Sequence, residues 1–144
     1  MLKRIPPILS PDLLAILARM GHGDDIVIAD GNFPAEGVAQ RLVRADGHGV
    51  VPLLQAVLQL FPIDTFVKDP VIVMQPVDPH SPEPPIWSQF RAALEHAEGR
   101  PIPLKPIERH EFYARARQAF AVVATGETAV YANLMLKKGV VHAQ

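Results

Sequence analysis

The sequence contains no cysteine among its 144 residues. This absence excludes disulfide bonds, a thiolate nucleophile and zinc sites built on thiolate ligands. A cysteine-free chain fits a reducing compartment, and we expect a cytoplasmic protein. Prolines at positions 6, 7 and 11 interrupt any apolar stretch behind the first basic residues, so no secretory signal is expected.

The sequence also lacks an excess of charge of one sign. Fourteen Lys and Arg residues stand against fifteen Asp and Glu residues, which gives a formal net charge of −1. Such a balance leaves no electrostatic footprint for nucleic acid or for an anionic membrane surface. The pair Lys137 and Lys138 is too small a basic group for phosphate-backbone binding. We therefore expect no nucleic-acid partner.

Long apolar runs are missing as well. The most apolar window, residues 50–63, is interrupted by Gln55, Gln59 and two prolines, so we expect no membrane-spanning segment. The composition is instead 49% hydrophobic and 20% charged, which is typical of a folded globular chain. A chain of this length is expected to form a single domain, residues 1–144, with a sizeable core.

Apolar periodicity and turn residues predict alternating helices and strands. Ser10, Pro11 and Asp12 supply a cap, a first-turn proline and a first-turn acid for a helix, which we expect to stop at a left-handed Gly21. Further helices are predicted at residues 50–60, 86–98 and about 111–119. Strands are predicted at residues 26–29, 42–45, 71–75, 104–107, 120–124 and 131–136, and the five prolines of residues 76–85 predict an irregular loop. The alternation indicates an α/β fold, a layered α/β/α domain with a mixed sheet.

Two titratable residues flank the apolar run at residues 26–29. His22 lies between two glycines before the run, and Asp30 follows its carboxyl end, where open α/β sheets bind ligands. At ~3.3 Å per residue, the strand separates the two side chains by roughly 20 Å. They share one site only if the turn folds His22 back or a second subunit closes the gap. The alternative is structural: His22 hydrogen-bonds within the turn, and Asp30 caps the next segment.

The last predicted strand offers a second polar pair. Strand alternation places Tyr131 and Asn133 on one face of the sheet and Ala132 on the other. A phenol and an amide side by side both donate and accept hydrogen bonds, which suits a hydroxyl-rich ligand. A solvent-facing sheet edge is the alternative interpretation of the same pattern.

Neither a metal site nor a cofactor is expected. Two Gly-x-Gly matches, at residues 21–23 and 47–49, lack the rest of a dinucleotide or P-loop signature. The candidate metal ligands lack His-x-His or His-x3-His spacing: His22, Asp24, Asp30 and His48.

Two separated blocks together resemble the ribose pyranase and L-fucose mutarotase family. The first is MGHGD at residues 20–24, with Asp30 eight residues after His22, and the second is TGE-x3-YAN at residues 125–133. RADG at residues 44–47 and LKKGV at residues 136–140 are similar to the fucose branch in particular. The resemblance spans nearly the whole chain. It implies a ribose-pyranase-like fold and a sugar mutarotase, which is an isomerase.

The resemblance also implies roles for individual residues. It makes His22 the catalytic proton donor. Tyr131 would relay a proton or orient the sugar. The implied sugar contacts are Asp30, Arg109, Tyr131, Ala132 and Asn133.

Position 109 bears on the choice between the two branches. An arginine there resembles the fucose branch, whereas the ribose branch has histidine. His110 follows immediately, so a shift of one residue would restore the ribose-like side chain. Arg109 is favoured because it requires no gap in the spacing.

The implied reaction exchanges the α and β anomers of L-fucose. One group takes the proton of the anomeric hydroxyl while another protonates the ring oxygen, and ring closure reverses both transfers without a cofactor. A histidine titrates near neutral pH and suits either part. The resemblance further implies a homo-oligomer, a ring-shaped decamer with pockets at subunit contacts. Two alternatives stay open: pyranose–furanose exchange on D-ribose, and a non-catalytic monosaccharide-binding accessory of transport.

Overall fold

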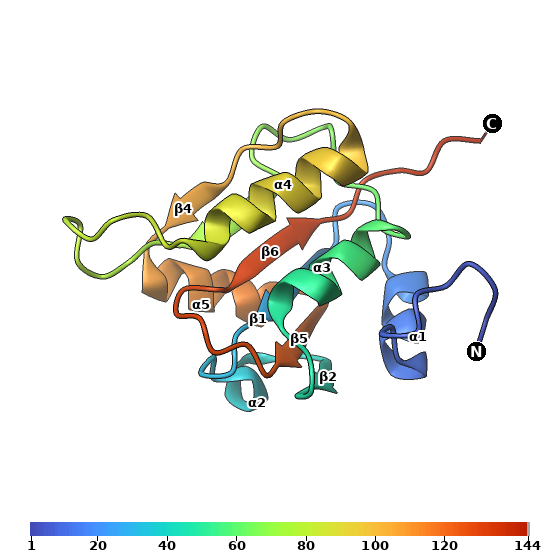
Figure 1. The fold of residues 1–144 in the computed structure, drawn as a ribbon, viewed down its shortest axis with the longest axis horizontal. Helices are drawn as coiled ribbons and strands as arrows, with labels where there is room; N and C mark the ends of the chain where they lie inside the picture. The colour runs from blue at the N-terminus through green and yellow to red at the C-terminus, as the bar shows by residue number, and fades with distance from the viewer. Residues whose placement is uncertain (144) are drawn as a thin grey trace.

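A computed structural model describes residues 1–143, and its centre is a mixed sheet of six strands (Figure 1). The strands are β1 (Asp25–Ala29), β2 (Leu42–Ala45), β3 (Val71–Met74), β4 (Lys105–Ile107), β5 (Ala121–Thr125) and β6 (Leu134–Lys137). Their order across the sheet is β2-β5-β1-β6-β3-β4. The pairs β1/β5, β2/β5 and β3/β4 are parallel, whereas β6 lies antiparallel between β1 and β3. β6 therefore runs against the direction shared by the other strands.

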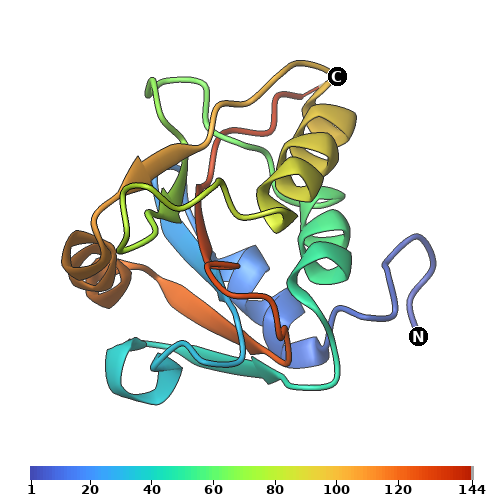
Figure 2. The same ribbon diagram turned by 60° about the vertical axis from the view of Figure 1, so that its left-hand side comes forward.

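Helices cover both faces of this sheet (Figure 2). Buried side chains of α1 (Pro11–Arg19), α3 (Val50–Leu58) and α4 (Ile86–Glu98) pack on one face. Those of α2 (Ala35–Val38) and α5 (Arg109–Gln118) pack on the other. The predicted α/β layering is confirmed. Within residues 1–143, no helix is long and apolar enough to cross a membrane.

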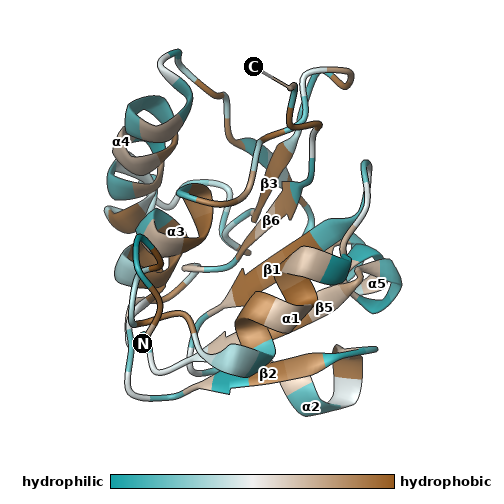
Figure 3. Ribbon diagram, turned by 90° about the vertical axis from the view of Figure 1, so that its right-hand side faces the viewer, coloured by the Kyte–Doolittle hydropathy of each residue, from teal (hydrophilic) through white to brown (hydrophobic). Residues whose placement is uncertain are grey.

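The strand β1 shows why a continuous apolar run was needed at the centre. Its side chains alternate between the two layers: Ile26 and Ile28 join the core under α1, α3 and α4, and Val27 and Ala29 join the core under α2 and α5. All four are fully buried. Figure 3 shows the same apolar character along β1 and β3. Burial on both faces explains why these strands lack polar alternation.

Local sequence signals set the ends of the helices. Ser10 caps α1, since its hydroxyl accepts a hydrogen bond of 3.2 Å from the Leu13 amide. The predicted left-handed stop at Gly21 is wrong, because the chain leaves α1 through an extended Met20 and the positive φ of 86° falls at Gly23. The helix α4 has the predicted bounds and ends at Gly99, with φ 71°.

Most predicted helices and strands end within two residues of the observed bounds, and three segments call for a physical explanation or were not expected. The strand β6 begins only at Leu134, so the predicted strand at residues 131–136 is wrong for its first three residues. Tyr131 instead has φ 55°, a left-handed conformation that interrupts any strand. The helix α5 starts at Arg109, earlier than expected, because the Glu108 carboxylate accepts from the amides of His110 and Glu111. The short α2 was not anticipated.

Candidate functional site

The directions of the strands gather three distant segments at one edge of the sheet. Asp30 follows β1, Arg109 comes shortly after β4, and residues 130–133 precede β6. Because β6 is antiparallel, its start lies beside the carboxyl ends of its neighbours β1 and β3. A cavity of about 270 Å³ lies at this edge. Residues of these segments line it together with neighbours from β3, the loop after β3 and α5, and the lining mixes polar, aromatic and aliphatic side chains: Asp30, Asn32, Phe33, Met74, Val77, Arg109, Tyr113, Val130, Tyr131 and Asn133.

Asp30 and Asn133 form the buried floor of this cavity, and both are about 5% exposed or less. The Asp30 amide donates to Asn133 Oδ1 at 2.8 Å, and Asn133 Nδ2 donates to Asp30 Oδ2 at 3.1 Å. The Asn32 amide donates to the other carboxylate oxygen at 3.0 Å. Burial raises the pKa of Asp30 above its ordinary value, although these hydrogen bonds oppose the shift.

Tyr131 reaches the cavity through a turn and not through strand alternation. Its hydroxyl accepts a hydrogen bond of 3.2 Å from the Val77 amide, which leaves its own proton available to a ligand. Trp87 Nε1 donates to the Tyr131 carbonyl at 3.0 Å and helps hold the left-handed backbone. Ala132 points away from the cavity and is fully buried in the core under α3 and α4. The predicted strand is therefore wrong, yet Tyr131 and Asn133 do line one cavity while Ala132 does not.

Arg109, and not His110, lines the cavity. Arg109 is the first residue of α5, so its side chain lies at the end of the helix nearest the sheet edge. The ring of His110 instead lies with its centroid 6.3 Å from that of Tyr113. Of the two candidates, the structure brings Arg109 to Asp30 and Tyr131.

His22 lies at the other end of β1 and does not line this cavity. Its Nε2 atom is 3.0 Å from Asp64 Oδ1, and its ring centroid is 4.9 Å from that of Phe66. The His22 side chain is 45% exposed, whereas that of Asp64 is 1% exposed. Since Asp64 holds Nε2, Nδ1 is the nitrogen left for a ligand. The turn therefore does not fold His22 back toward Asp30 within one chain.

Asp64 was missed by the sequence analysis. Burial raises the pKa of this carboxyl, but hydrogen bonds from His22 and from the backbone of Phe66 outweigh it, so the pKa lies below its ordinary value. No spacing marks Asp64, because its partner is 42 positions away. Tyr113 was also missed by the sequence analysis, and the structure places it in the cavity lining from the second turn of α5.

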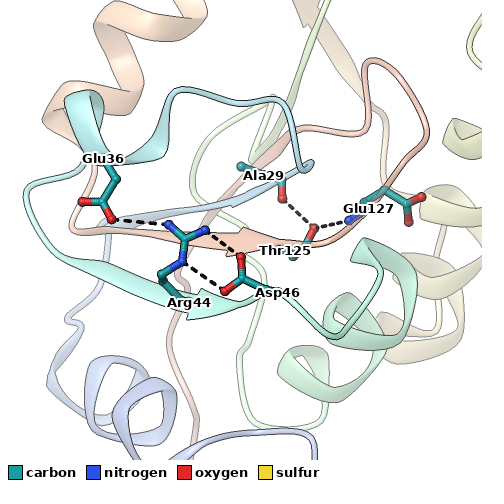
Figure 4. Close-up of polar contacts among 6 residues, drawn as sticks. All are labelled: Ala29, Glu36, Arg44, Asp46, Thr125 and Glu127. Atoms are coloured by element: carbon teal, nitrogen blue, oxygen red, sulfur yellow. Dashed lines mark hydrogen bonds and ion pairs between the residues drawn. The ribbon is translucent and has the colours of Figure 1, made fainter.

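The blocks at residues 44–47 and 125–127 meet beside the site (Figure 4). The Thr125 hydroxyl donates to the Ala29 carbonyl at 2.7 Å and accepts from the Glu127 amide at 3.1 Å. A Cβ atom on Gly126 would lie 1.9 Å from the Asp46 carbonyl oxygen, so glycine is required there. These contacts fix β5 against β1 immediately before Asp30.

A larger cavity, of about 800 Å³, lies between α3 and α4. Its lining is mostly aliphatic and glutamine side chains, with His96 as the one titratable group and no carboxylate. We assign function to the smaller cavity because it gathers a carboxylate, a guanidinium and two phenols. Among the described residues, no group of three or more His, Asp or Glu side chains is placed to hold a metal ion.

Comparison with known proteins gives consistent relatives. The sequence profile of the RbsD / FucU transport protein family matches residues 3–141. The chain is 52% identical to the fucose mutarotase of Homo sapiens over 145 residues, covering 96% of this chain and 94% of that one. It is 46% identical to the L-fucose mutarotase of Histophilus somni (strain 2336) over 140 residues, covering 97% of each chain.

Solved structures give the same result for the fold. The fucose mutarotase of Streptococcus pneumoniae in complex with L-fucose superposes with a TM-score of 0.93 at 43% identity, covering 98% of this chain and 100% of that one. The Bacillus subtilis RbsD complexed with D-ribose gives 0.71 at 25% identity, covering 99% and 100%. The resemblance drawn from residues 20–30 and 125–133 is thus confirmed, and the chain belongs to the RbsD / FucU transport protein family.

Proposed function

We propose that this chain is an L-fucose mutarotase, an isomerase that interconverts the α and β anomers of its sugar. The observation that carries the proposal is the cavity lining, where Asp30, Asn133 and Tyr131 offer hydrogen-bonding groups beside Arg109. The identity of the chain to fucose mutarotases, 46–52%, supports L-fucose over D-ribose as the sugar, as does Arg109 in the cavity lining. Residues 1–144 act as one mutarotase domain, and the cysteine-free composition supports a cytoplasmic location.

The reaction needs one proton taken and one given. A base removes the proton of the C1 hydroxyl, the bond between C1 and the ring oxygen breaks, and an acid protonates that oxygen. The aldehyde turns its other face, and the reverse transfers close the ring as the other anomer. In our proposal Asp30, Arg109 and Asn133 bind hydroxyls of the sugar, and His22 is the proton donor. Tyr131 relays a proton or orients the sugar.

His22 must come from a second subunit in this proposal. Within one chain the length of β1 separates it from Asp30, so a pocket with both groups requires His22 of the partner subunit. Exposed apolar side chains lie beside His22 and beside the cavity, and they support such a contact between subunits. Phe66 next to His22 is 73% exposed, and Val77 and Val130 at the cavity are 64% and 65% exposed. We propose the ring-shaped decamer as the assembly.

Magnetization-transfer NMR between the two anomeric protons tests the function. We expect the added protein to accelerate exchange of L-fucose far more than pyranose–furanose exchange of D-ribose. The reverse preference would replace the proposal by a ribose pyranase. Calorimetric binding of L-fucose with no acceleration would replace it by a non-catalytic sugar-binding module. Light scattering tests the assembly separately, since a 15.8 kDa monomer would contradict a pocket shared between subunits.

A further inference from the structure

The segment formed by Lys137, Lys138 and Gly139, here called the 137–139 segment, binds two loops that lie far apart in the sequence. One is the turn at residues 20–24, which contains His22. The Gly23 amide donates to the Lys138 carbonyl at 2.8 Å, and the Lys138 amide donates to the Asp24 carbonyl at 2.9 Å. Main-chain hydrogen bonds thus fix the turn at Gly23 and Asp24, the two residues that follow His22.

The same segment also binds the loop that contains Asp64. The Asp64 amide donates to the Lys137 carbonyl at 3.0 Å, and the Gly139 amide donates to the Pro62 carbonyl at 2.8 Å. Ile63 forms a β-bridge with Lys138. The two loops therefore bind to opposite edges of the same extended backbone. Held in this way, they bring His22 Nε2 within 3.0 Å of Asp64 Oδ1.

Gly139 is required by close backbone approach. A Cβ atom at this position would lie 2.8 Å from the Ile63 carbonyl oxygen, 2.9 Å from Asp64 Cα and 3.0 Å from the Asp64 amide nitrogen. All three neighbours are main-chain atoms, which cannot swing aside as the end of a long side chain can. Any larger residue must displace the backbone of Asp64 itself.

Lys138 acts on the other loop through its side chain. Its ammonium donates to the Met20 carbonyl at 2.6 Å, at the C-terminal end of α1. A cation at this end satisfies a carbonyl that has no partner within the helix and interacts favourably with the helix dipole. Met20 is the residue at which the chain leaves α1 toward His22, so the lysine sets where the turn begins.

We propose that Lys138 and Gly139 are positioning residues for His22. They hold its imidazole against the Asp64 carboxylate, so that Nδ1 faces the sugar in a fixed direction. The inference rests on the proposed function, in which His22 is the proton donor. It gives the LKKG stretch a role that its sequence, two adjacent lysines before a glycine, does not reveal.

The test compares three variants with two matched controls. Gly139→Ala displaces the Asp64 backbone, Lys138→Met removes the ammonium, and Lys138→Arg retains a donor for Met20. Gly47→Ala and Lys105→Met are the controls. A Cβ atom added at Gly47 would have no neighbour within 4 Å, and Lys105 lies exposed on β4. Each variant is measured twice, by the imidazole ¹⁵N signals of His22 and by kcat and KM for L-fucose exchange.

We expect Gly139→Ala and Lys138→Met to shift the ¹⁵N signals of His22 and leave those of His96 in place. We expect kcat to fall ~10–100-fold, as small misplacements of a catalytic group do. KM should change little, because the sugar contacts lie at the other end of β1, and Lys138→Arg should recover most of kcat. If Gly139→Ala does not fold, Lys138→Met decides.

Unchanged His22 signals in folded Gly139→Ala and Lys138→Met would overturn the positioning role, whatever the activity. Equal effects on kcat and KM, or no recovery in Lys138→Arg, would also overturn it. Shifted signals in a protein that accelerates no anomer exchange would support the positioning role while refuting the proposed function. The two proposals therefore fail separately.

Discussion

Asp30 and Asn133 hold each other in a single orientation. Asn133 Oδ1 accepts from the Asp30 amide, so its Nδ2 must face the Asp30 carboxylate, while the other carboxylate oxygen accepts from the Asn32 amide. Both oxygens of the Asp30 carboxyl therefore face N–H donors, and both must act as acceptors. The pair therefore depends on one carboxylate and one amide side chain at these two positions.

This geometry predicts that Asp30→Asn is not conservative. Whichever way the new amide turns, its NH₂ group meets the NH₂ of Asn133 or the N–H of Asn32. An unsatisfied buried donor costs about 1–3 kcal/mol, so thermal unfolding should occur at a lower temperature and sugar binding should weaken.

The exchanged pair Asp30→Asn with Asn133→Asp is the matched control. It restores all three hydrogen bonds, because the new carboxylate accepts from both the amide and the backbone of residue 30. We expect it to recover much of the thermal stability lost in Asp30→Asn, but not the turnover, since the carboxylate has moved. A double variant no more stable than Asp30→Asn would refute the proposed orientation of the pair.

His22→Ala should remove most of the exchange activity while the fold survives. The side chain is 45% exposed and contributes little to the core, whereas loss of one positioned acid or base typically costs ~10²–10⁴-fold in rate. NMR exchange rates together with circular dichroism check both halves of the expectation, with the exposed His142→Ala as the control. Exchange within a few-fold of the unmodified protein would contradict the role of His22.

The lowered pKa of Asp64 predicts a dependence of stability on pH. The folded state stabilises the ionised form of the Asp64 carboxyl more than the unfolded state does. The resulting contribution to the free energy of unfolding is fully present above the unfolded pKa. It is lost as the pH falls through the lower, folded pKa. The difference in unfolding free energy between the unmodified protein and Asp64→Asn should therefore be constant near neutral pH and shrink in acid, as measured by urea titration. A difference that grows in acid would contradict the sign of the shift.

The sequence predicted the strands better than it predicted the site. Apolar runs such as residues 26–29 give a strong signal, because a strand buried on both faces must be apolar throughout. Strand length also correctly indicated that His22 and Asp30 lie apart. Two features had no local signal: the His22–Asp64 contact joins residues 42 positions apart, and the positive φ of Tyr131 leaves no mark in a polar–apolar alternation.

Three consecutive residues at the cavity should respond to substitution in three different ways. Tyr131 and Asn133 line the cavity, whereas Ala132 is fully buried in the core. Ala132→Gly should act on thermal stability alone, through lost packing. Asn133→Ala should weaken sugar binding, with each lost hydrogen bond costing about 0.5–1.5 kcal/mol. It should also lower thermal stability, because it removes both hydrogen bonds to Asp30 and leaves the buried Asp30 N–H without its acceptor.

Tyr131→Phe separates the two roles of the phenol. It removes only the hydroxyl, which accepts from the Val77 amide and has a proton to donate, and it leaves the Trp87 contact to the Tyr131 carbonyl intact. If the hydroxyl relays a proton, kcat for anomer exchange should fall more than the affinity measured by calorimetry. If it only orients the sugar, the two should fall together. Should Tyr131→Phe and Asn133→Ala leave both binding and exchange unchanged, the sugar does not bind between Asp30 and Tyr131, because Tyr131 and Asn133 both line that cavity.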